Sequence, residues 1–463
     1  MKMSNCSQKI QSSFRKRGVG SVTATMLLGL LVFLPCLRAQ QDGGSNSAAL
    51  PVTVFGGGER PRMNYSGEQS PQNVLLVTTG YEASYDDNPL SQRAGAQADE
   101  EQSVGTQLAL VHQSARLTAN VNYEPYFQFY RRYNQFNRFN QTFSADGLFT
   151  FSPHLAVRVR DDFLDQTGLY APSNSDLSPA GIGSPTALNS TIYTPLNNER
   201  ANTSRADIVI QKDSRTSLDA FGGYATRTFS QGTTTPFGTT TQNMGGEYVW
   251  RASEHASLGL LGVYERIDLS GALLPGSASR LQSGTLLPTM GWKLRPTIEL
   301  SLFAGPQAIR QIDLQDSSSK QTTLPVQIDW EAGGGLVVDG KAIGLMLSAQ
   351  HTVTDGGGVL SFVTNNSVSG GLRKRLHGGW DFNVECGLAR NRWIPLDASS
   401  AWLTEESVRA VLVRPLHGST VLHFEYEYLE QTPGGDLNVG SNFHRNRVAT
   451  NVAWNWHAIR LGH

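Results

Sequence analysis

Charged side chains recur at even spacing in several stretches of the chain, and apolar or aromatic residues separate them. Residues two or four apart point to the same face of a β-strand. A charged face is costly in a packed core. It suits a strand beside water, where it could form an electrostatic filter for passing solutes. The stretches are "LAVRVRDDFL" with Arg158 and Arg160, "WDFNVECGLA" with Asp381 and Glu385, and "TVLHFEYEY" with Glu425 and Glu427.

Other polar residues share this spacing in neighbouring stretches, and we predict that together they line a pore. The signs are mixed, so no ring of one sign is predicted, and simple hydration and cross-pairing of these charges is the alternative. Tyr126 and Tyr130 could also stack on sugar rings. The predicted pore-lining residues are Arg116, Glu124, Tyr126, Arg158, Arg160, Asp381, Glu385, Glu425, Glu427 and Arg447.

The sequence offers little for catalysis or metal binding. His112 lies near Ser114, and Ser253 near His255, but both pairs fall at expected tight turns, where such residues are common. There is no Gly-x-Ser-x-Gly, no His pair at metal spacing and no Cys-x-x-Cys. The acidic run Asp161, Asp162 and Asp165 lacks the calcium-loop pattern, and we expect a solvated rim there. We therefore predict no enzyme, no cofactor, no metal and no catalytic residue.

A β-strand with one polar and one apolar face is predicted most clearly at Arg116–Tyr130, "RLTANVNYEPYFQFY". Its odd positions are apolar or aromatic and its even positions are mostly polar, which predicts a strand of unusual length. A transmembrane β-strand needs roughly 9–11 residues and has aromatic girdles at the two interfaces. We expect Arg116–Glu124 to be embedded and the aromatic half to rise beyond it. Pro125 cannot donate to a ladder, so a bulge or an unpaired position is expected there.

Short turns and longer polar loops alternate along the rest of the chain. This alternation predicts an all-β fold: a single antiparallel up-and-down barrel of about 16–18 strands, with short periplasmic turns and long extracellular loops. The loop Asp165–Arg200 is expected to fold in and narrow the pore. The expected turns are Gln113–Ser114, Ser152–His154, Asp213–Arg215, Ser253–His255, Arg295–Pro296, Asp339–Gly340, Leu376–Gly379 and Pro415–Gly418.

The N-terminus has the layout of a secretory signal peptide. A basic region precedes the apolar run Met26–Leu34, which is too short to span a membrane as a helix. We predict a signal peptide over 1–39, a flexible periplasmic lead-in over 40–73 and the barrel over 74–463. The alternative of lipidation at Cys36 is disfavoured by Pro35.

Removing the signal peptide changes the charge of the chain. Six of the 38 basic side chains lie in residues 1–39 with no acidic one, which leaves 32 basic against 39 acidic side chains, a formal charge of −7. A nucleic-acid partner is therefore not expected. Only Cys386 would remain, so no intrachain disulfide is possible. The mean hydropathy of −0.29 does not exclude a barrel, because its strands are only half apolar.

The chain resembles bacterial outer-membrane β-barrel proteins over Val74 to His457. More weakly, it resembles the β-barrel porin 2 type, some of which accompany exopolysaccharide systems, through "GYEASYDDNPL" at Gly80–Leu90. The resemblance implies outer-membrane lipid, lipopolysaccharide and the barrel assembly machinery as partners. Trp454 and Trp456 could provide the aromatic signal that this machinery recognises.

Three functions remain open on the sequence. The first is a water-filled pore in the outer membrane for passive diffusion of small polar solutes. The second, from the weaker resemblance, is export or surface anchoring of exopolysaccharide. The third is a non-conducting structural or adhesion barrel that acts through its loops. Neither the solute nor the oligomeric state follows from the sequence.

Overall fold

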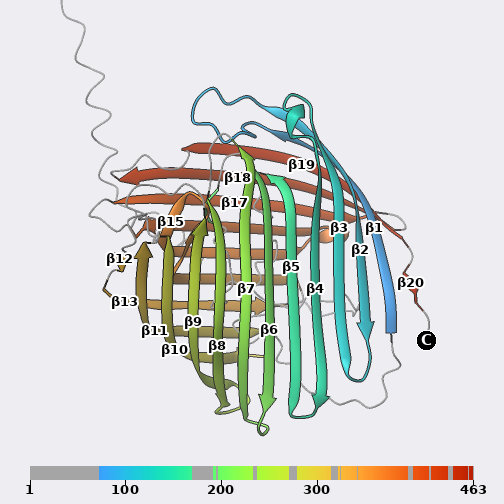
Figure 1. The fold of residues 1–463 in the computed structure, drawn as a ribbon. Coiled ribbons are helices and arrows are strands. Elements are labelled where there is room, and N and C mark those ends of the chain that lie inside the picture. Colours follow the sequence, from blue (N-terminus) through green and yellow to red (C-terminus); the bar gives the residue numbers. More distant parts are fainter. Residues whose placement is uncertain are drawn as a thin grey trace, which may run out of the picture. The chain divides into compact units, whose positions relative to one another are not determined.

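The computed structural model describes residues 72–168, 191–193, 197–232, 237–270, 279–313, 322–323, 325–340, 342–394, 400–416, 419–435, 442–456 and 458–461. Within them, eighteen long strands form one antiparallel sheet that closes on itself (Figure 1). The predicted up-and-down barrel of 16–18 strands is thus confirmed. The expected signal peptide and the lead-in up to residue 71 lie outside the described residues. The first strand begins at Gln72, two residues before the expected start of the barrel.

The first nine long strands are β1 (Gln72–Asp86), β2 (Asp99–Gln113), β3 (Leu117–Tyr130), β4 (Arg138–Ser152), β5 (Leu155–Gly168), β6 (Asn197–Gln211), β7 (Thr216–Gly232), β8 (Gly238–Arg251) and β9 (Ala256–Ser270). The next nine are β10 (Arg280–Arg295), β11 (Ile298–Asp313), β13 (Gln327–Asp339), β14 (Ile343–Gly356), β15 (Leu360–Arg375), β16 (Asp381–Trp393), β17 (Ala401–Pro415), β18 (Thr420–Gly435) and β19 (Phe443–Asn455). Four short elements complete the described chain: β12 (Thr322–Thr323), β20 (Ile459–Arg460) and the 3-10 turns η2 (Asn134–Phe136) and η4 (His377–Gly379).

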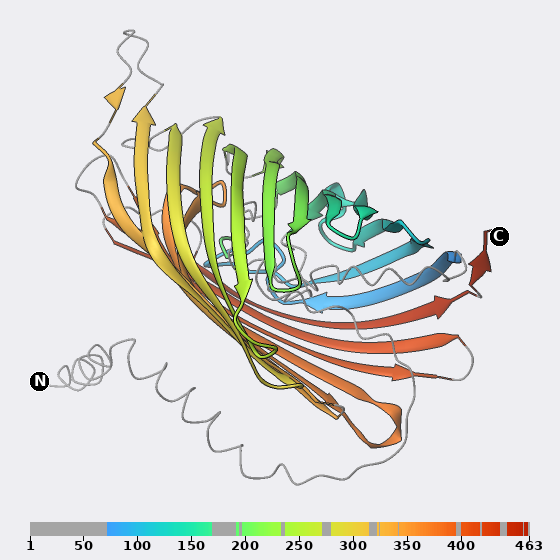
Figure 2. The same cartoon turned by 90° about the horizontal axis from the view of Figure 1, so that it is seen from below.

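Each long strand pairs with its neighbours in chain order, and the ring closes where β1 pairs with β19 from Thr78↔Asn455 to Asp86↔Arg447. Figure 2 shows β1, in blue, beside β19, in red. The two-residue strand β20 pairs with Val74 and Leu75 near the start of β1, and the two-residue strand β12 pairs with Ile312 and Asp313 at the end of β11. Because the ring is closed, it has no free edge strand. A sheet that spans lipid must be closed in this way.

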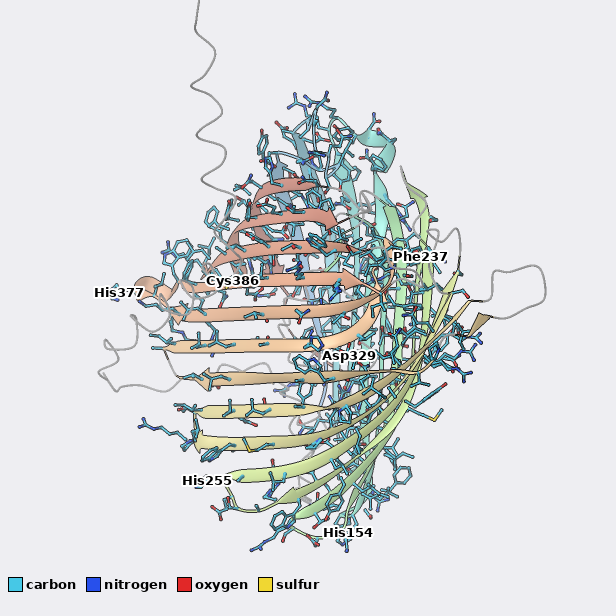
Figure 3. All side chains as sticks on the ribbon, turned by 90° about the vertical axis from the view of Figure 1, so that its left-hand side faces the viewer. His154, Phe237, His255, Asp329, His377 and Cys386 are labelled. Carbon is cyan, nitrogen blue, oxygen red and sulfur yellow. The ribbon has the colours of Figure 1, made fainter. Side chains whose placement is uncertain are left out.

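Eight short turns join the strands at one end of the barrel, which we call the short-turn end, and each falls where the sequence predicted it. Figure 3 labels His154, His255 and His377 in three of them. In the turn before β7, Asp213 accepts hydrogen bonds from the backbone N–H groups of Arg215 and Thr216, both at 2.7 Å. The hydrogen bond from Arg215 lowers the pKa of Asp213. Local side-chain chemistry therefore determines where these strands reverse.

Large apolar side chains stay exposed on one face of the strands, as a lipid-facing surface requires. On β3 these are Phe127 and Phe129, which are 50% and 46% exposed, and their rings lie 6.2 Å apart. On β19 they are Val448, Val452 and Trp454. The other face carries the polar positions, so the alternation predicted from the sequence separates the exterior from the interior.

Pro125 is not at a bulge or above the paired region, and that expectation is wrong. It lies within β3 and pairs with Gln141 of β4. On its other side, the pairs between β2 and β3 stop at Leu108↔Tyr123 and resume at Gly105↔Tyr126 without a change of register. The missing N–H of Pro125 therefore falls in a two-residue gap of one ladder, and the strand continues past it.

No helix among the described residues is long and apolar enough to cross a membrane.

Candidate pore lining

Charged residues of alternating sign cross the inner wall where the barrel closes. Directly opposite positions on consecutive strands are Glu385↔Arg409, Arg409↔Glu427, Glu427↔Arg447 and Arg447↔Asp86. We call these five residues, on β16, β17, β18, β19 and β1, the charge row. Because neighbouring strands are only about 5 Å apart, each arginine of the row lies between two carboxylates. Sequence spacing alone gave inward positions to Glu385, Arg409, Glu427 and Arg447 but missed Asp86.

Each arginine of the charge row also reaches a carboxylate next to the row. Arg409 makes a two-pronged contact with Glu425, through Nε–Oε1 and Nη2–Oε2 at 2.9 Å each. Arg447 pairs with Glu82 and lies 3.9 Å from Glu101. Hydrogen-bonded pairs with two parallel contacts are among the strongest ion pairs and fix side-chain geometry. The inner wall here is therefore charged and ordered.

A second charged patch lies on β4, β5 and β6. Arg158 and Arg160, both predicted to line the pore, share Asp146 of β4 at 2.7 and 3.2 Å. Arg205 pairs with Asp207 on β6 at 2.6 Å. Arg160 lies opposite Arg205, and Arg158 lies opposite Asp207. The structure thus brings the two predicted arginines together over one carboxylate.

The remaining predicted residues are spread along the barrel. Glu124 and Tyr126 lie on the inner face of β3, where Tyr126 opposes Gly105 of β2. A Cβ at Gly105 would lie 2.6 Å from the Cβ of Tyr126, so only glycine fits beside the tyrosine. Asp381 lies at the start of β16 and pairs with Arg375 at 3.3 Å. Arg116 lies in the turn before β3, at the end of the barrel rather than on its wall.

Three residues of the connection between β5 and β6, Thr191–Tyr193, contact a distant part of the inner wall. The side chain amides of Asn365 and Asn391 both donate to the Thr191 hydroxyl at 2.9 Å. Gln431 accepts from the backbone N–H of Tyr193 at 2.8 Å and donates to its carbonyl at 3.1 Å. These partners lie on β15, β16 and β18, six or more strands from β5 and β6 around the ring.

The contact between Thr191–Tyr193 and the inner wall is buried. Ile192 is only 6% exposed and packs with Val363 and Trp393. Desolvation raises the pKa of Tyr193 well above its usual value, and the neighbouring Glu405 raises it further. The phenol therefore stays neutral. For these three residues, the expected inward folding of the Asp165–Arg200 loop is confirmed.

We call the end of the barrel opposite the short-turn end the loop end. Here a second segment, besides Thr191–Tyr193, departs from the wall. Strands β13 and β14 pair only up to Ala332↔His351, whereas β14 and β15 stay paired as far as Gly356↔Leu360. Above His351 the β14–β15 hairpin therefore separates from β13. We call residues 352–364 the inner hairpin.

Buried contacts show that the inner hairpin turns into the barrel. Val353 and Phe362 follow the outward alternation of their strands, yet they are 3% and 0% exposed. Both belong to a cluster with residues from β9, β10 and β11 and with Phe237, which is labelled in Figure 3. The Asp355 carboxylate lies 3.7 Å from the guanidinium of Arg227 on β7, six strands along the wall. The backbone N–H of Phe237 donates to the carbonyl of Gly358 at 3.3 Å.

The inner hairpin and Thr191–Tyr193 also touch each other. A Cβ placed on Gly357 would lie 2.8 Å from the Cβ of Ile192. Leu360 and Val363 of the hairpin share a buried cluster with Ile192. Two segments from different connections thus meet inside the loop end of the barrel and narrow it.

The residues considered for catalysis or for metal binding make hydrogen bonds and ion pairs with neighbouring residues. Ser114 and the backbone of Leu117 hydrogen-bond to each other across a turn. Ser253 accepts from the backbone N–H of His255. Asp165 pairs with Arg138 and Arg200. Among the described residues, no group of three or more His, Cys, Asp or Glu could hold a metal ion.

Residues Tyr85–Asn88, which belong to the stretch that carries the weaker resemblance, hold β1 and β19 together. We call this junction of the first and last long strands the seam of the barrel. Asp86 pairs with Arg445 of β19. Asp87 accepts from both the backbone and the side chain amide of Asn446 at 2.7 Å. Asn88 donates to the carbonyl of His444 at 2.9 Å. These contacts give the motif a role in closing the barrel.

A closed barrel with an apolar exterior and a charged interior defines an outer-membrane β-barrel. No protein-family model matches this chain, and no curated protein matches it significantly. Among solved structures, it is similar to OpdQ of Pseudomonas aeruginosa, at 9% identity over 84% of this chain and 98% of that one, TM-score 0.44.

Two further solved structures show comparable similarity. One is the outer membrane protein OpdK of P. aeruginosa, at 11% identity over 82% of this chain and 99% of that one, TM-score 0.43. The other is OccAB3 of Acinetobacter baumannii, at 11% identity over 84% and 99%, TM-score 0.41. Similarity at this level gives no information about a solute.

Proposed function

We propose that the chain forms a water-filled pore in a bacterial outer membrane and conducts small polar solutes by passive diffusion. The observation that carries the proposal is the inner face of the closed barrel, where Arg158, Arg409 and Arg447 are held in ion pairs. Charged side chains on a wall are stable only where they are hydrated or paired with opposite charges. Such side chains can also replace part of the hydration shell of a passing solute.

The proposal includes the export route. Residues 1–39 would direct the chain across the inner membrane and be removed, residues 40–73 would lead into the barrel, and the short-turn end would face the periplasm. The inner hairpin and Thr191–Tyr193 would then narrow the pore near its extracellular mouth. Solutes would pass along the inner wall without a cofactor or a chemical step.

Planar-bilayer recording of the purified full-length barrel tests this function. We expect stepwise conductance in KCl and swelling of proteoliposomes in small polar solutes. Heat-modifiable electrophoretic mobility would show that the barrel is folded. A folded barrel that gives neither conductance steps nor proteoliposome swelling would contradict the proposal.

If the protein exported or anchored exopolysaccharide, deletion of its gene would change the amount of surface sugar without changing the uptake of small solutes. The residues that suggested it, Tyr85–Asn88, close the seam of the barrel, and we do not extend the proposal to it. An adhesion barrel would lose surface binding, but no conductance, when the β5–β6 connection is shortened.

A further inference from the structure

We propose that the outer face of β9, β10 and β11 binds the phosphate groups of lipopolysaccharide near the loop end of the barrel. The inference rests on the membrane placement in the proposed function, with the loop end outside the cell, and it does not depend on conduction. Three observations carry it: the height of the site on the outer wall, the gathering of arginines there, and the shortage of carboxylates around them.

The outer face of β10 shows where the apolar band of the wall ends. Even-numbered residues of this strand point outward, since Leu286 and Trp292 are exposed. The outward residues between Gln282 and Trp292 are all non-polar: Gly284, Leu286, Pro288 and Met290. With a rise of about 3.4 Å per residue and a strand tilt of about 40°, the step from Gln282 to Trp292 spans roughly 26 Å of height. An apolar band about 25 Å tall is typical of outer-membrane barrels, so Gln282 lies at its loop-end edge, where lipid headgroups begin.

Three arginines gather on the outer face at this edge. Arg266 of β9 and Arg310 of β11 lie directly opposite Gln282 of β10, one on each side. Arg280, two residues before Gln282 on the same face, lies opposite Asp268 of β9. The three strands are consecutive in the wall (Figure 1). Because neighbouring strands are about 5 Å apart, the three arginines begin within roughly 10 Å of one another.

One carboxylate serves two of these three arginines. Arg266 Nε donates to Asp268 Oδ2 at 2.7 Å, and Arg280 pairs with the other oxygen of Asp268. Arg310 is exposed, and it makes no ion pair with any residue that the structure describes. Three arginines against one carboxylate leave an excess of two positive charges on this face.

No second carboxylate faces outward in this part of the wall. On the described strands from β7 to β13, Asp268 is the only acidic residue at an outward position. Glu265 is next to Arg266 in sequence but has the opposite parity and faces the interior. The connection between β9 and β10 contains no charged residue, and that between β11 and β13 contains one of each sign, Asp316 and Lys320. The excess positive charge is therefore left for a ligand or solvent ions to balance.

The order of side chains up the wall matches the order of groups in lipopolysaccharide. A guanidinium can donate two parallel hydrogen bonds to a phosphate, and the guanidinium of Arg310 is not engaged by a described carboxylate. Tyr264, exposed two residues below Arg266, places an amphipathic ring at the level of the headgroups. Further down, the exposed Leu286 and Leu302 face the acyl chains. Phosphate, interface and acyl chain thus each meet a suitable surface.

Native mass spectrometry of the full-length protein in detergent tests this inference. The probes are bisphosphorylated lipid A, which is the lipid anchor of lipopolysaccharide, and the same lipid without its phosphates. EDTA is present so that no divalent cation bridges the lipid to carboxylates. We expect the phosphorylated lipid to bind at least about tenfold more tightly, since each basic side chain near an anionic lipid contributes about fivefold, and we expect inorganic phosphate not to displace it.

Two results with the parent protein would overturn the inference: equal affinity for the two lipids, or displacement of the phosphorylated lipid by an equal concentration of inorganic phosphate. A conducting barrel that gives either result loses only this inference. A barrel that binds the phosphorylated lipid but does not conduct would contradict only the proposed function.

A single substitution locates the site. Arg310→Gln should lower the affinity for the phosphorylated lipid about fivefold and leave the affinity for the dephosphorylated lipid unchanged. Because Arg310 makes no ion pair with a described residue, the variant should keep the heat-modifiable mobility of the folded parent. The control is Arg131→Gln, which removes an exposed arginine that pairs one to one with Glu100 at the loop end. If Arg310→Gln binds the phosphorylated lipid as tightly as this control, the inference fails.

Discussion

Asp86 and Arg445 form a buried ion pair between the two strands that close the barrel. Arg445 Nε donates to Asp86 Oδ2 at 2.6 Å, and the two side chains are only 2% and 3% exposed. β1 and β19 are about 360 residues apart in sequence, so their pairing comes at a high cost in chain entropy. The pair therefore stabilises the contact that forms the ring.

We predict that Asp86→Asn lowers the stability of the folded barrel by about 3–5 kcal/mol, because it breaks a buried ion pair by removing the carboxylate charge that faces Arg445. The measurement is the unfolding midpoint in urea, followed by heat-modifiable mobility. The matched control is Glu100→Gln, which removes an exposed pair with Arg131 whose side chains are 75% and 53% exposed. Such pairs contribute about 0–1 kcal/mol. Equal effects of the two substitutions would contradict the role given to Asp86.

Phe362 anchors the inner hairpin to the inner face of β9, β10 and β11. We predict that Phe362→Ala raises single-channel conductance and current noise, because the cavity it leaves costs about 3–5 kcal/mol and loosens the hairpin from β9–β11. Single-channel recording is the measurement. Phe151→Ala is the control, since Phe151 is 54% exposed on the outer face. Unchanged conductance of a folded Phe362→Ala barrel would show that the hairpin does not limit the current.

The sequence predicted the wall of this barrel well, because the wall is encoded locally. Turn residues such as Asp213 bind their own backbone, and alternation of period two assigns each side chain to a face. The inner hairpin could not be predicted in the same way. Val353 and Phe362 keep the alternation of lipid-facing residues, and only the distant cluster with Phe237 shows that their strand has turned inward.

The charged lining was predicted residue by residue but not as an arrangement. Spacing found Glu427 and Arg447 without showing that Arg409 and Asp86 continue the same row, because register between strands depends on turn lengths and closure. One local signal was available for the hairpin. Gly356, Gly357 and Gly358 are consecutive, and the φ angles of Gly357 and Gly358 are 60° and 81°.

Gln431 holds the segment Thr191–Tyr193 against β18 through both of its side chain amide atoms. We predict that Gln431→Leu releases this segment, since a buried backbone N–H left without a partner costs about 1–3 kcal/mol. In a Cys386→Ser background, a cysteine introduced by Ile192→Cys should react with a membrane-impermeant maleimide faster when Gln431→Leu is added. Gln102→Leu, on the exposed outer face of β2, is the control. Equal labelling rates in the three proteins would contradict the tether.

Gly357 is the point at which the inner hairpin meets Ile192, and glycine is required there for two reasons. Its φ of +60° is disfavoured for residues with a Cβ, and a Cβ would lie 2.8 Å from that of Ile192. We predict that Gly357→Ala separates the hairpin from Thr191–Tyr193 and increases single-channel conductance, while the unfolding midpoint falls only slightly because the wall is untouched. Gly147→Ala is the control, since nothing lies within 4 Å of a Cβ on Gly147 and its outward position on β4 faces away from the lumen. A folded Gly357→Ala barrel with the conductance of Gly147→Ala would show that the contact between the two segments does not set the width of the pore.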